Sequence, residues 1–416
     1  MVASVLLMFL FTFVEPGYYS RMMGERDLMH WNISLYGFIA FSSLVLLAGA
    51  VLSAKLPSLL FRKRRAMWST SLTGYLLGPT LVAILLLALT FDRIIHNAPS
   101  LFALLNQSKG SELKTVFGAA ASDAWTGSFP FALGIGWWGF HHLLEYGSSV
   151  PRSDRVASRI LQLVLILAIV VASAVVLSRF VLMPLMFGLM LIYVKHYVAK
   201  DSFRSSKLLL LGILGVVVML GFFAVASRFR GANSSGAVVK SAIGYGPASM
   251  NRCAAVLDGS LDNSNLSDYL FEQNFGFIEN FPFISRLRSN SYFAGQKTQQ
   301  SIYDAIASAN LNEKYIWLTS YGEIFLQFGS YYFLYVFAYG FLVGRFWRAF
   351  KRSKRLGIVL YPWAAFNVMY IFGSNFFASR YLSILLMLVA ALVVYDVFLE
   401  PQVFRRATGA DSSGSL

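Results

Sequence analysis

Ten long apolar runs, separated by shorter polar stretches, set the pattern of the chain. They cover residues 2–14, 31–54, 70–90, 124–145, 160–177, 180–198, 207–226, 320–344, 357–373 and 381–398. Most of them approach the roughly 20 residues that an α-helix needs to cross about 30 Å of hydrocarbon. The pattern therefore predicts an all-α fold, a polytopic transmembrane helical bundle of about ten spans.

The stretch from Ile160 to Val194 contains a single charged residue, Arg179. It is too long for one span and long enough for two, so we expect a helical hairpin with Ser178 and Arg179 at its tip. The first run is short and has neither a basic start nor an A-x-A cleavage site, which favours a first span over a signal peptide. The alternative is nine spans, with residues 2–14 lying at the membrane interface.

The distribution of lysine and arginine sets the predicted orientation. With the N-terminus in the cytoplasm and the spans alternating, the inner connections hold 20 of the 35 basic residues, the short outer connections hold 7 and one long outer loop holds 8. This bias favours ten spans with both termini cytoplasmic. It also accounts for the net charge of +15 without a nucleic-acid partner.

Three regions follow from this topology. Residues 1–226 form spans one to seven, residues 227–316 form the long outer loop, and residues 317–416 form spans eight to ten with a cytoplasmic tail. The composition agrees, because the chain is 57% hydrophobic and 13% charged, and a soluble chain this apolar could not cover its own core. Within the loop, Ile302 and Ile306 at helical spacing indicate a surface helix over 297–310.

Four arginines are predicted near the outer membrane surface. Arg179 and Arg380 each lie at the tip of a tight hairpin, and Arg228, followed closely by Arg230, lies where the seventh span ends. Guanidinium is planar and permanently charged, and it binds phosphate oxygens in pairs, so such a set suits an anionic headgroup, above all a pyrophosphate. Arg179 and Arg380 are therefore candidate catalytic residues, and Arg228 and Arg230 candidate substrate ligands. The alternative is that these side chains anchor helix ends to lipid phosphates.

The long loop adds further candidates for substrate binding. Arg252, Arg286 and Arg288 supply positive charge, while Phe275 and Phe277 belong to a stretch in which phenylalanines alternate with amide side chains. Aromatic faces beside amides suit sugar rings, which offer apolar C–H faces and a rim of hydroxyls. An interfacial segment lying on the bilayer would have the same composition.

Glu323, which follows Tyr321 at the outer start of the eighth span, is the third catalytic candidate. A carboxylate at the membrane edge is costly unless it is paired or functional. It would act as a general base toward a sugar hydroxyl, or it would pair with a loop arginine. Tyr321 is taken with it as a candidate substrate contact.

Several kinds of chemistry have no support in the sequence. There is no phosphate-binding glycine loop, no G-x-S-x-G and no H-E-x-x-H, and none of the five histidines falls in the long loop. His141 and His142 lie near an inner membrane end, which favours an interfacial role over metal binding. The single cysteine, Cys253, permits no internal disulfide. We therefore predict neither a metal nor a cofactor.

These features together resemble a known family. The chain resembles the Wzy-type O-antigen and exopolysaccharide repeat-unit polymerases, and more distantly the O-antigen ligases. The resemblance rests on the number of spans, the one large outer loop before the last few spans, the Ser178-Arg179 hairpin tip and the segment 319–329 (Thr-Ser-Tyr-Gly-Glu-Ile-Phe-Leu-Gln-Phe-Gly). Ligases place a histidine near the start of that segment, where this chain has Leu318, Thr319 and Ser320. The difference favours a polymerase.

The resemblance implies a location, a substrate and a reaction. The chain would lie in a bacterial inner membrane as a transmembrane bundle with a large periplasmic loop between spans seven and eight. Donor and acceptor would both be undecaprenyl-pyrophosphate-linked oligosaccharides, and the growing glycan would move to a hydroxyl of the incoming repeat unit without a metal. A chain-length regulator protein would be a further partner. The alternatives are a polysaccharide flippase or transporter without chemistry, and an O-antigen ligase.

Overall fold

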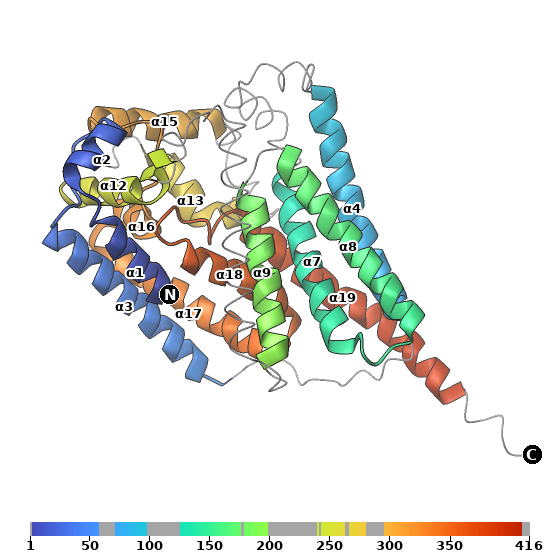
Figure 1. The fold of residues 1–416 in the computed structure, drawn as a ribbon. Helices are drawn as coiled ribbons and strands as arrows, with labels where there is room; N and C mark the ends of the chain where they lie inside the picture. Colours follow the sequence, from blue (N-terminus) through green and yellow to red (C-terminus); the bar gives the residue numbers. More distant parts are fainter. Residues whose placement is uncertain are drawn as a thin grey trace, which may run out of the picture. The chain divides into compact units, whose positions relative to one another are not determined.

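The computed structural model describes residues 2–57, 71–97, 125–175, 179–198, 239–240, 243–262, 266–279 and 295–409, some of them without their side chains. Every regular element in these ranges is a helix (Figure 1). Four stretches are long and apolar enough to cross a membrane, namely 33–55, 72–92, 152–173 and 320–351. The expectation of a helical membrane protein is confirmed at this level. The number of ten spans and the outer loop stay predictions.

Most of the predicted runs correspond to helices with shifted ends. The helices that match them are α3 (Ile33–Lys55), α4 (Leu72–Asn97), α7 (Trp125–Tyr146), α8 (Arg152–Val175), α9 (Arg179–Val198), α18 (Arg355–Met369) and α19 (Arg380–Gly409). Residues 176–178, which include the predicted hairpin tip at Ser178, and the predicted span 207–226 lie outside the described residues. The described part of the predicted loop contains three further helices: α12 (Pro247–Leu257), α13 (Ser267–Glu279) and α15 (Gly295–Ser308).

Two predicted spans are interrupted. The first run forms α1 (Val2–Phe11), which is followed after a bend of 85° by α2 (Pro16–Met23). The carboxylate of Glu15 caps α2 by accepting from the backbone N–H groups of Gly17 and Tyr18. The eighth run divides into α16 (Ser320–Phe328), a 3-10 turn at 329–331 and α17 (Tyr332–Lys351). Gly329 ends α16 with a φ of 54°, a conformation that glycine adopts without strain.

The chain folds as two compact units, each described here by itself. Unit 1 comprises residues 1–55, 231–348 and 363–383, and unit 2 comprises residues 56–230, 349–362 and 384–416. In unit 1 the helices of the predicted loop pack on α16 around a core that includes Leu266, Leu270, Ile302, Ile306 and Leu318. Ile302 and Ile306 are therefore buried, and α15 confirms the predicted helix while showing that its apolar side faces this core rather than solvent.

Helices α3 and α17 of unit 1 approach each other through glycines. A Cβ atom added to Gly49 would lie 2.3 Å from the carbonyl oxygen of Phe337, and one added to Gly340 would lie 2.0 Å from that of Leu46. Gly344, four residues after Gly340, would similarly meet the carbonyl oxygen of Ala50 at 2.3 Å. This small-xxx-small spacing brings two membrane helices into backbone contact, where dispersion forces are strongest.

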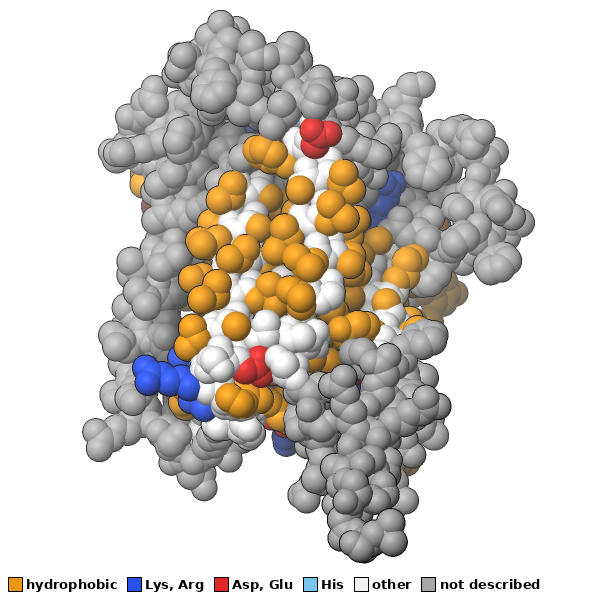
Figure 2. Space-filling model, turned by 90° about the vertical axis from the view of Figure 1, so that its right-hand side faces the viewer, with side chains coloured by type: hydrophobic (Ala, Val, Ile, Leu, Met, Phe, Trp, Pro, Cys, Tyr) orange, Lys and Arg blue, Asp and Glu red, His pale blue; other side chains and the backbone are white. Residues whose placement is uncertain are grey.

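Unit 2 contains α4, α7, α8 and α9, which lie side by side (Figure 1). Asp154 on α8 caps α4, because its carboxylate accepts from the backbone N–H of Leu72 at 2.7 Å and of Thr73 at 3.0 Å. The outward side chains of α4 and α8 are apolar, for example Leu81, Leu85 and Leu163. Figure 2 shows hydrophobic side chains gathered over most of the described part of this face, with charged side chains toward its upper and lower ends. Such a surface is what the hydrocarbon of a bilayer requires.

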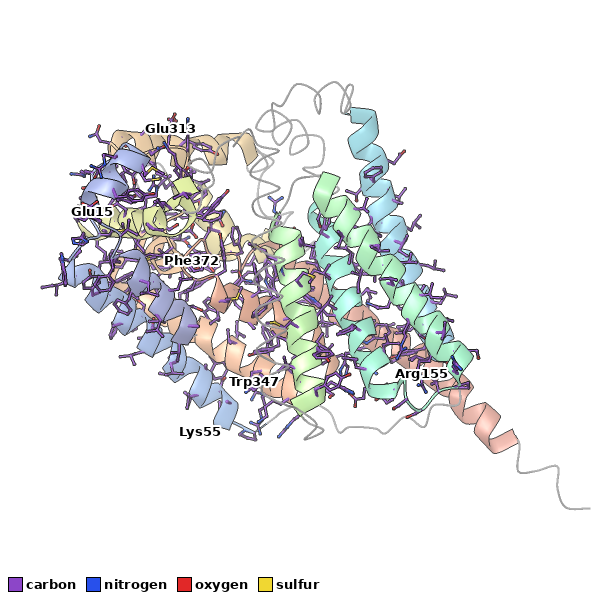
Figure 3. All side chains as sticks on the ribbon, viewed as in Figure 1. Glu15, Lys55, Arg155, Glu313, Trp347 and Phe372 are labelled. Carbon is purple, nitrogen blue, oxygen red and sulfur yellow. The ribbon has the colours of Figure 1, made fainter. Side chains whose placement is uncertain are left out.

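Cys253 in α12 offers a direct check of the packing in unit 1. Its side chain is fully buried, and burial raises the pKa of the thiol to about 12. Because only the thiolate reacts, we expect maleimide to label the folded protein at least about 100-fold more slowly than the denatured protein at pH 7.5. A Glu313→Cys variant, with its new thiol at an exposed position (Figure 3), should gain one rapidly labelled site. Rapid labelling of the native protein would contradict the buried position of α12.

Candidate functional site

Helix α16 begins at a strained residue. Thr319 has φ 65° and ψ 152°, values that a β-branched residue rarely adopts. Its hydroxyl oxygen accepts from the N–H of Gly322 at 3.0 Å and so caps the helix. Strained backbone persists only where surrounding contacts hold it, and it occurs often at functional sites. This start places Glu323 in the first turn of α16.

Glu323 is the centre of a buried polar network. Its side chain is fully buried, and its Oε1 accepts from the Ser374 hydroxyl at 2.6 Å and from the Tyr269 hydroxyl at 3.3 Å. Its Oε2 accepts from the backbone N–H of Asn375 at 2.7 Å. These donors offset the cost of burying the carboxyl group. Glu323 thus ties α16 to the irregular segment 370–379, which connects α18 to α19 and includes Phe372 (Figure 3).

The network continues through amide side chains. Asn375 donates through Nδ2 to Oδ1 of Asn274 at 2.6 Å, and Asn274 in turn donates to Gln327 on α16. The hydroxyl of Tyr335 on α17 donates to the backbone carbonyl of Asn274 at 2.7 Å. Helices α13, α16 and α17 are therefore joined to the segment 370–379 by polar contacts that are largely buried.

Helix α13 also contacts this segment through its backbone. The N–H of Phe277 donates to the carbonyl of Ala378 at 2.8 Å. A Cβ atom built on Gly276 would lie 3.4 Å from the backbone nitrogen of Arg380, an ordinary van der Waals distance, so α13 packs directly on the start of α19. Arg380 is the first residue of α19 and is half-buried.

The structure brings five of the predicted site residues into this region of unit 1. Phe277 and Arg380 flank the contact just described, and the ring of Phe275 packs on Phe328 and Tyr335 with centroid distances of 5.7 and 6.0 Å. Glu323 lies at the centre of the network. Tyr321 is fully buried on the side of α3, with its hydroxyl 3.2 Å from that of Ser43.

Two of the predicted roles need correction. Both oxygens of Glu323 accept from neutral donors among the described residues, so the geometry favours a positioning role over that of an open general base. Arg252 pairs with Glu25 and not with Glu323, and pairing with another loop arginine stays a prediction. Arg252 is fully buried, and its guanidinium donates to Glu25 at 3.0 and 3.1 Å and to the carbonyls of Ala248 and Asn312. It therefore serves as half of an internal ion pair and not as an open ligand for substrate.

The remaining predicted arginines are not placed by the structure. Arg228, Arg230, Arg286 and Arg288 lie outside the described residues, and Arg179, the first residue of α9 in unit 2, is described without its side chain. The predicted arginine set at the outer surface therefore stays a prediction.

Sequence reasoning missed most of the partners of Glu323. Ser374 and Asn375 belong to the short polar segment between two apolar runs, and their polarity at a membrane edge was the available signal. Tyr269 and Tyr335 carry no such signal, because tyrosines are common in apolar stretches near a membrane surface. Within the described ranges, no group of three or more His, Cys, Asp or Glu side chains could hold a metal ion.

No protein-family model, no curated protein and no solved structure matches this chain.

Proposed function

We propose that the protein is a membrane glycosyltransferase that polymerises lipid-linked oligosaccharide repeat units, with undecaprenyl pyrophosphate as the leaving group. The observation that carries the proposal is the way Arg380 is held. The segment leading into it is fixed by Glu323 and by α13, so this permanently charged residue begins α19 from a backbone that is held in place. A preorganised cation of this kind stabilises charge as it develops.

The proposed step needs little else from the protein. The bond between the anomeric carbon and the pyrophosphate oxygen breaks, and a bond forms between that carbon and a hydroxyl oxygen of the incoming repeat unit. The electron pair stays on the pyrophosphate, where Arg380 offsets its charge, and the hydroxyl proton passes to solvent or to the departing phosphate. Holding donor and acceptor side by side supplies much of the remaining acceleration. Glu323 acts by positioning the segment before Arg380.

Arg380→Ala tests this proposal directly. With purified protein and lipid-linked repeat units, we expect wild type to form longer glycans and Arg380→Ala to form them about 100-fold more slowly, because one preorganised donor to developing charge is lost. Lys55→Ala is the matched control, since it also removes a cation at a helix end in unit 1 and should leave the rate unchanged. Products are separated by size on a gel. An Arg380→Ala variant with the wild-type rate would remove Arg380 from the site, and a wild type that forms no longer glycans would remove the proposed function.

One observation favours the second candidate, a polysaccharide flippase or transporter. The candidate span 320–351 contains a 3-10 turn at 329–331, and α1 and α2 form a bent pair that could be a broken span. Interrupted membrane helices with buried polar groups are common in transporters. Substrate flux across liposomes without any elongation would support transport. Elongation with a lipid A core as the acceptor would identify an O-antigen ligase instead.

A further inference from the structure

Two buried polar atoms, one in the network and one on α17, have no hydrogen-bond partner among the described residues. They are the hydroxyl of Tyr339 and Oδ1 of Asn375, whose residues are 2% and 1% exposed. Buried polar groups in native proteins are nearly always satisfied by protein, water or a ligand. These two atoms, unsatisfied by the described residues, therefore leave room for a further hydrogen-bond partner.

The orientation of the Asn375 amide follows from its neighbours. Tyr335 has one hydroxyl proton, which it donates to the carbonyl of Asn274 at 2.7 Å. Toward Asn375, at 3.5 Å, it can only accept, so Nδ2 of Asn375 faces Tyr335. The same Nδ2 donates to Oδ1 of Asn274. Oδ1 of Asn375 must then face away from both, and it offers its lone pairs to another group.

Tyr339 lies on the same face of α17 as Tyr335. It follows Tyr335 by one helical turn on α17, so the two side chains share a face. Its ring stacks on Phe377 at 4.2 Å between centroids with an interplanar angle of 20°. Segment 375–377 thus runs along this face of α17, with Asn375 at Tyr335 and Phe377 at Tyr339. The two residues with an unsatisfied atom thus both lie where the segment packs on α17.

We propose that Tyr339 and Asn375 bind a hydroxyl group of the substrate sugar, an inference that rests on the proposed glycosyltransferase function. A hydroxyl donates one hydrogen bond and accepts others, which matches a carbonyl oxygen that only accepts and a phenol that donates. A phosphate or carboxylate would be repelled by Oδ1 of Asn375. The pair would distinguish between sugars by leaving these atoms unsatisfied when the hydroxyl is absent or misplaced.

Both atoms are inaccessible in this structure, so the sugar must enter while α13 is displaced. Helix α13 is joined to the segment through Asn274 and through the hydrogen bond from Phe277 to Ala378. Helix α13 also contributes Tyr269 and Leu270 to the core of unit 1, and Phe275 packs on Phe328 and Tyr335. Displacing the helix therefore opens this part of the core together with the segment. The hydroxyl then replaces the missing partner when α13 returns.

The phenol of Tyr339 gives the decisive test, because it has a matched control one turn away. Tyr339→Phe removes an unsatisfied hydroxyl and keeps the ring on Phe377, so thermal stability should be unchanged or higher. The KM for lipid-linked repeat units should rise about tenfold, as expected for one lost hydrogen bond. Tyr335→Phe removes a hydroxyl that the protein itself uses and should lower thermal stability.

Wild-type elongation is measured first, so that a failure of the proposed function is recognised separately. If wild type elongates and Tyr339→Phe keeps the wild-type KM, the inference is wrong. It is equally wrong if Tyr339→Phe loses stability with an unchanged KM, since a buried water would then complete the pair.

A disulfide tests whether α13 must move. An ideal Cβ atom on Gly276 lies 3.6 Å from the Cα atom of Ser379, a separation compatible with a disulfide between cysteines at these positions. We expect Gly276→Cys/Ser379→Cys to elongate glycans when reduced and to lose at least 90% of its rate, on the order of tenfold, when oxidised. Each single variant serves as a control for oxidation. Full activity of the cross-linked protein would contradict entry under α13.

Discussion

Changing Arg252 to methionine should cost the protein about 3–5 kcal/mol of unfolding free energy, because it leaves the buried carboxylate of Glu25 without its cation. The two side chains form a pair with 0% exposure on either side. Oε2 of Glu25 also accepts from the backbone N–H of Asn312 at 2.6 Å, and Nδ2 of Asn251 donates to Oε1 at 3.1 Å. One carboxylate thus joins the N-terminal region to α12 and to the segment before α16.

The measurement is the melting temperature of the detergent-solubilised protein, taken as the temperature at which it loses its monodisperse peak in size-exclusion chromatography. Arg26→Ala is the matched control, because the neighbouring arginine makes an exposed hydrogen bond to Ser260 and should change the free energy of unfolding by less than about 0.5 kcal/mol. The double variant Glu25→Leu/Arg252→Met should recover part of the loss, since an apolar pair of similar volume tolerates burial. Equal melting temperatures for Arg252→Met and Arg26→Ala would show that the pair is not buried as described.

Gly49→Ala should destabilise the contact between α3 and α17 strongly, whereas Gly37→Ala on the same helix should not. The new methyl group at position 49 would lie 2.3 Å from the carbonyl oxygen of Phe337, which is backbone and cannot rotate away. The two helices must therefore separate, with a loss of about 1–3 kcal/mol or more. At Gly37 nothing lies within 4 Å of the new methyl group, so the better helix propensity of alanine should leave stability equal or raise it by up to about 1 kcal/mol.

Expression level and thermal stability of the two variants, compared in the same membranes and detergent, check this prediction. Gly340→Ala should behave like Gly49→Ala, because its methyl group would meet the carbonyl oxygen of Leu46 at 2.0 Å. If Gly49→Ala and Gly37→Ala were equally stable, α3 and α17 would not be in backbone contact.

The sequence predicted the helices well and their interruptions poorly. A run of apolar residues indicates a helix because the hydrocarbon leaves the backbone few alternatives, and α3 and α4 begin and end within a few residues of the predicted runs, apart from the polar end of α4. The interruption at Gly329 depends on the positive φ angle of that one residue. The apolar character of the surrounding run gives no sign of it. The bend before α2 had a local signal in Glu15 and Pro16, a cap followed by a proline at the first helical position.

For the site, the sequence identified the groups that are costly to bury but not what they bind. Glu323 was a candidate because a carboxylate at a membrane edge is costly unless it is paired or functional. The structure shows that Ser374, Asn375 and Tyr269 donate hydrogen bonds to it. Arg252 was interpreted as an open ligand, since nothing in the neighbouring sequence shows a partner. Glu25 lies 227 positions earlier, and a contact of that range has no local signature.

The junction at Glu25 also has a consequence for how the chain is made. Its carboxylate accepts from Asn312, which is added to the chain 287 residues later. At synthesis rates of about 5–20 residues per second, the first helices wait roughly 15 to 60 seconds before this hydrogen bond can form. Arg252 is added 227 residues after Glu25, so the carboxylate lacks its cation for most of that interval and lacks Asn312 until its end. The N-terminal helices therefore cannot reach their final packing until most of the chain has been made.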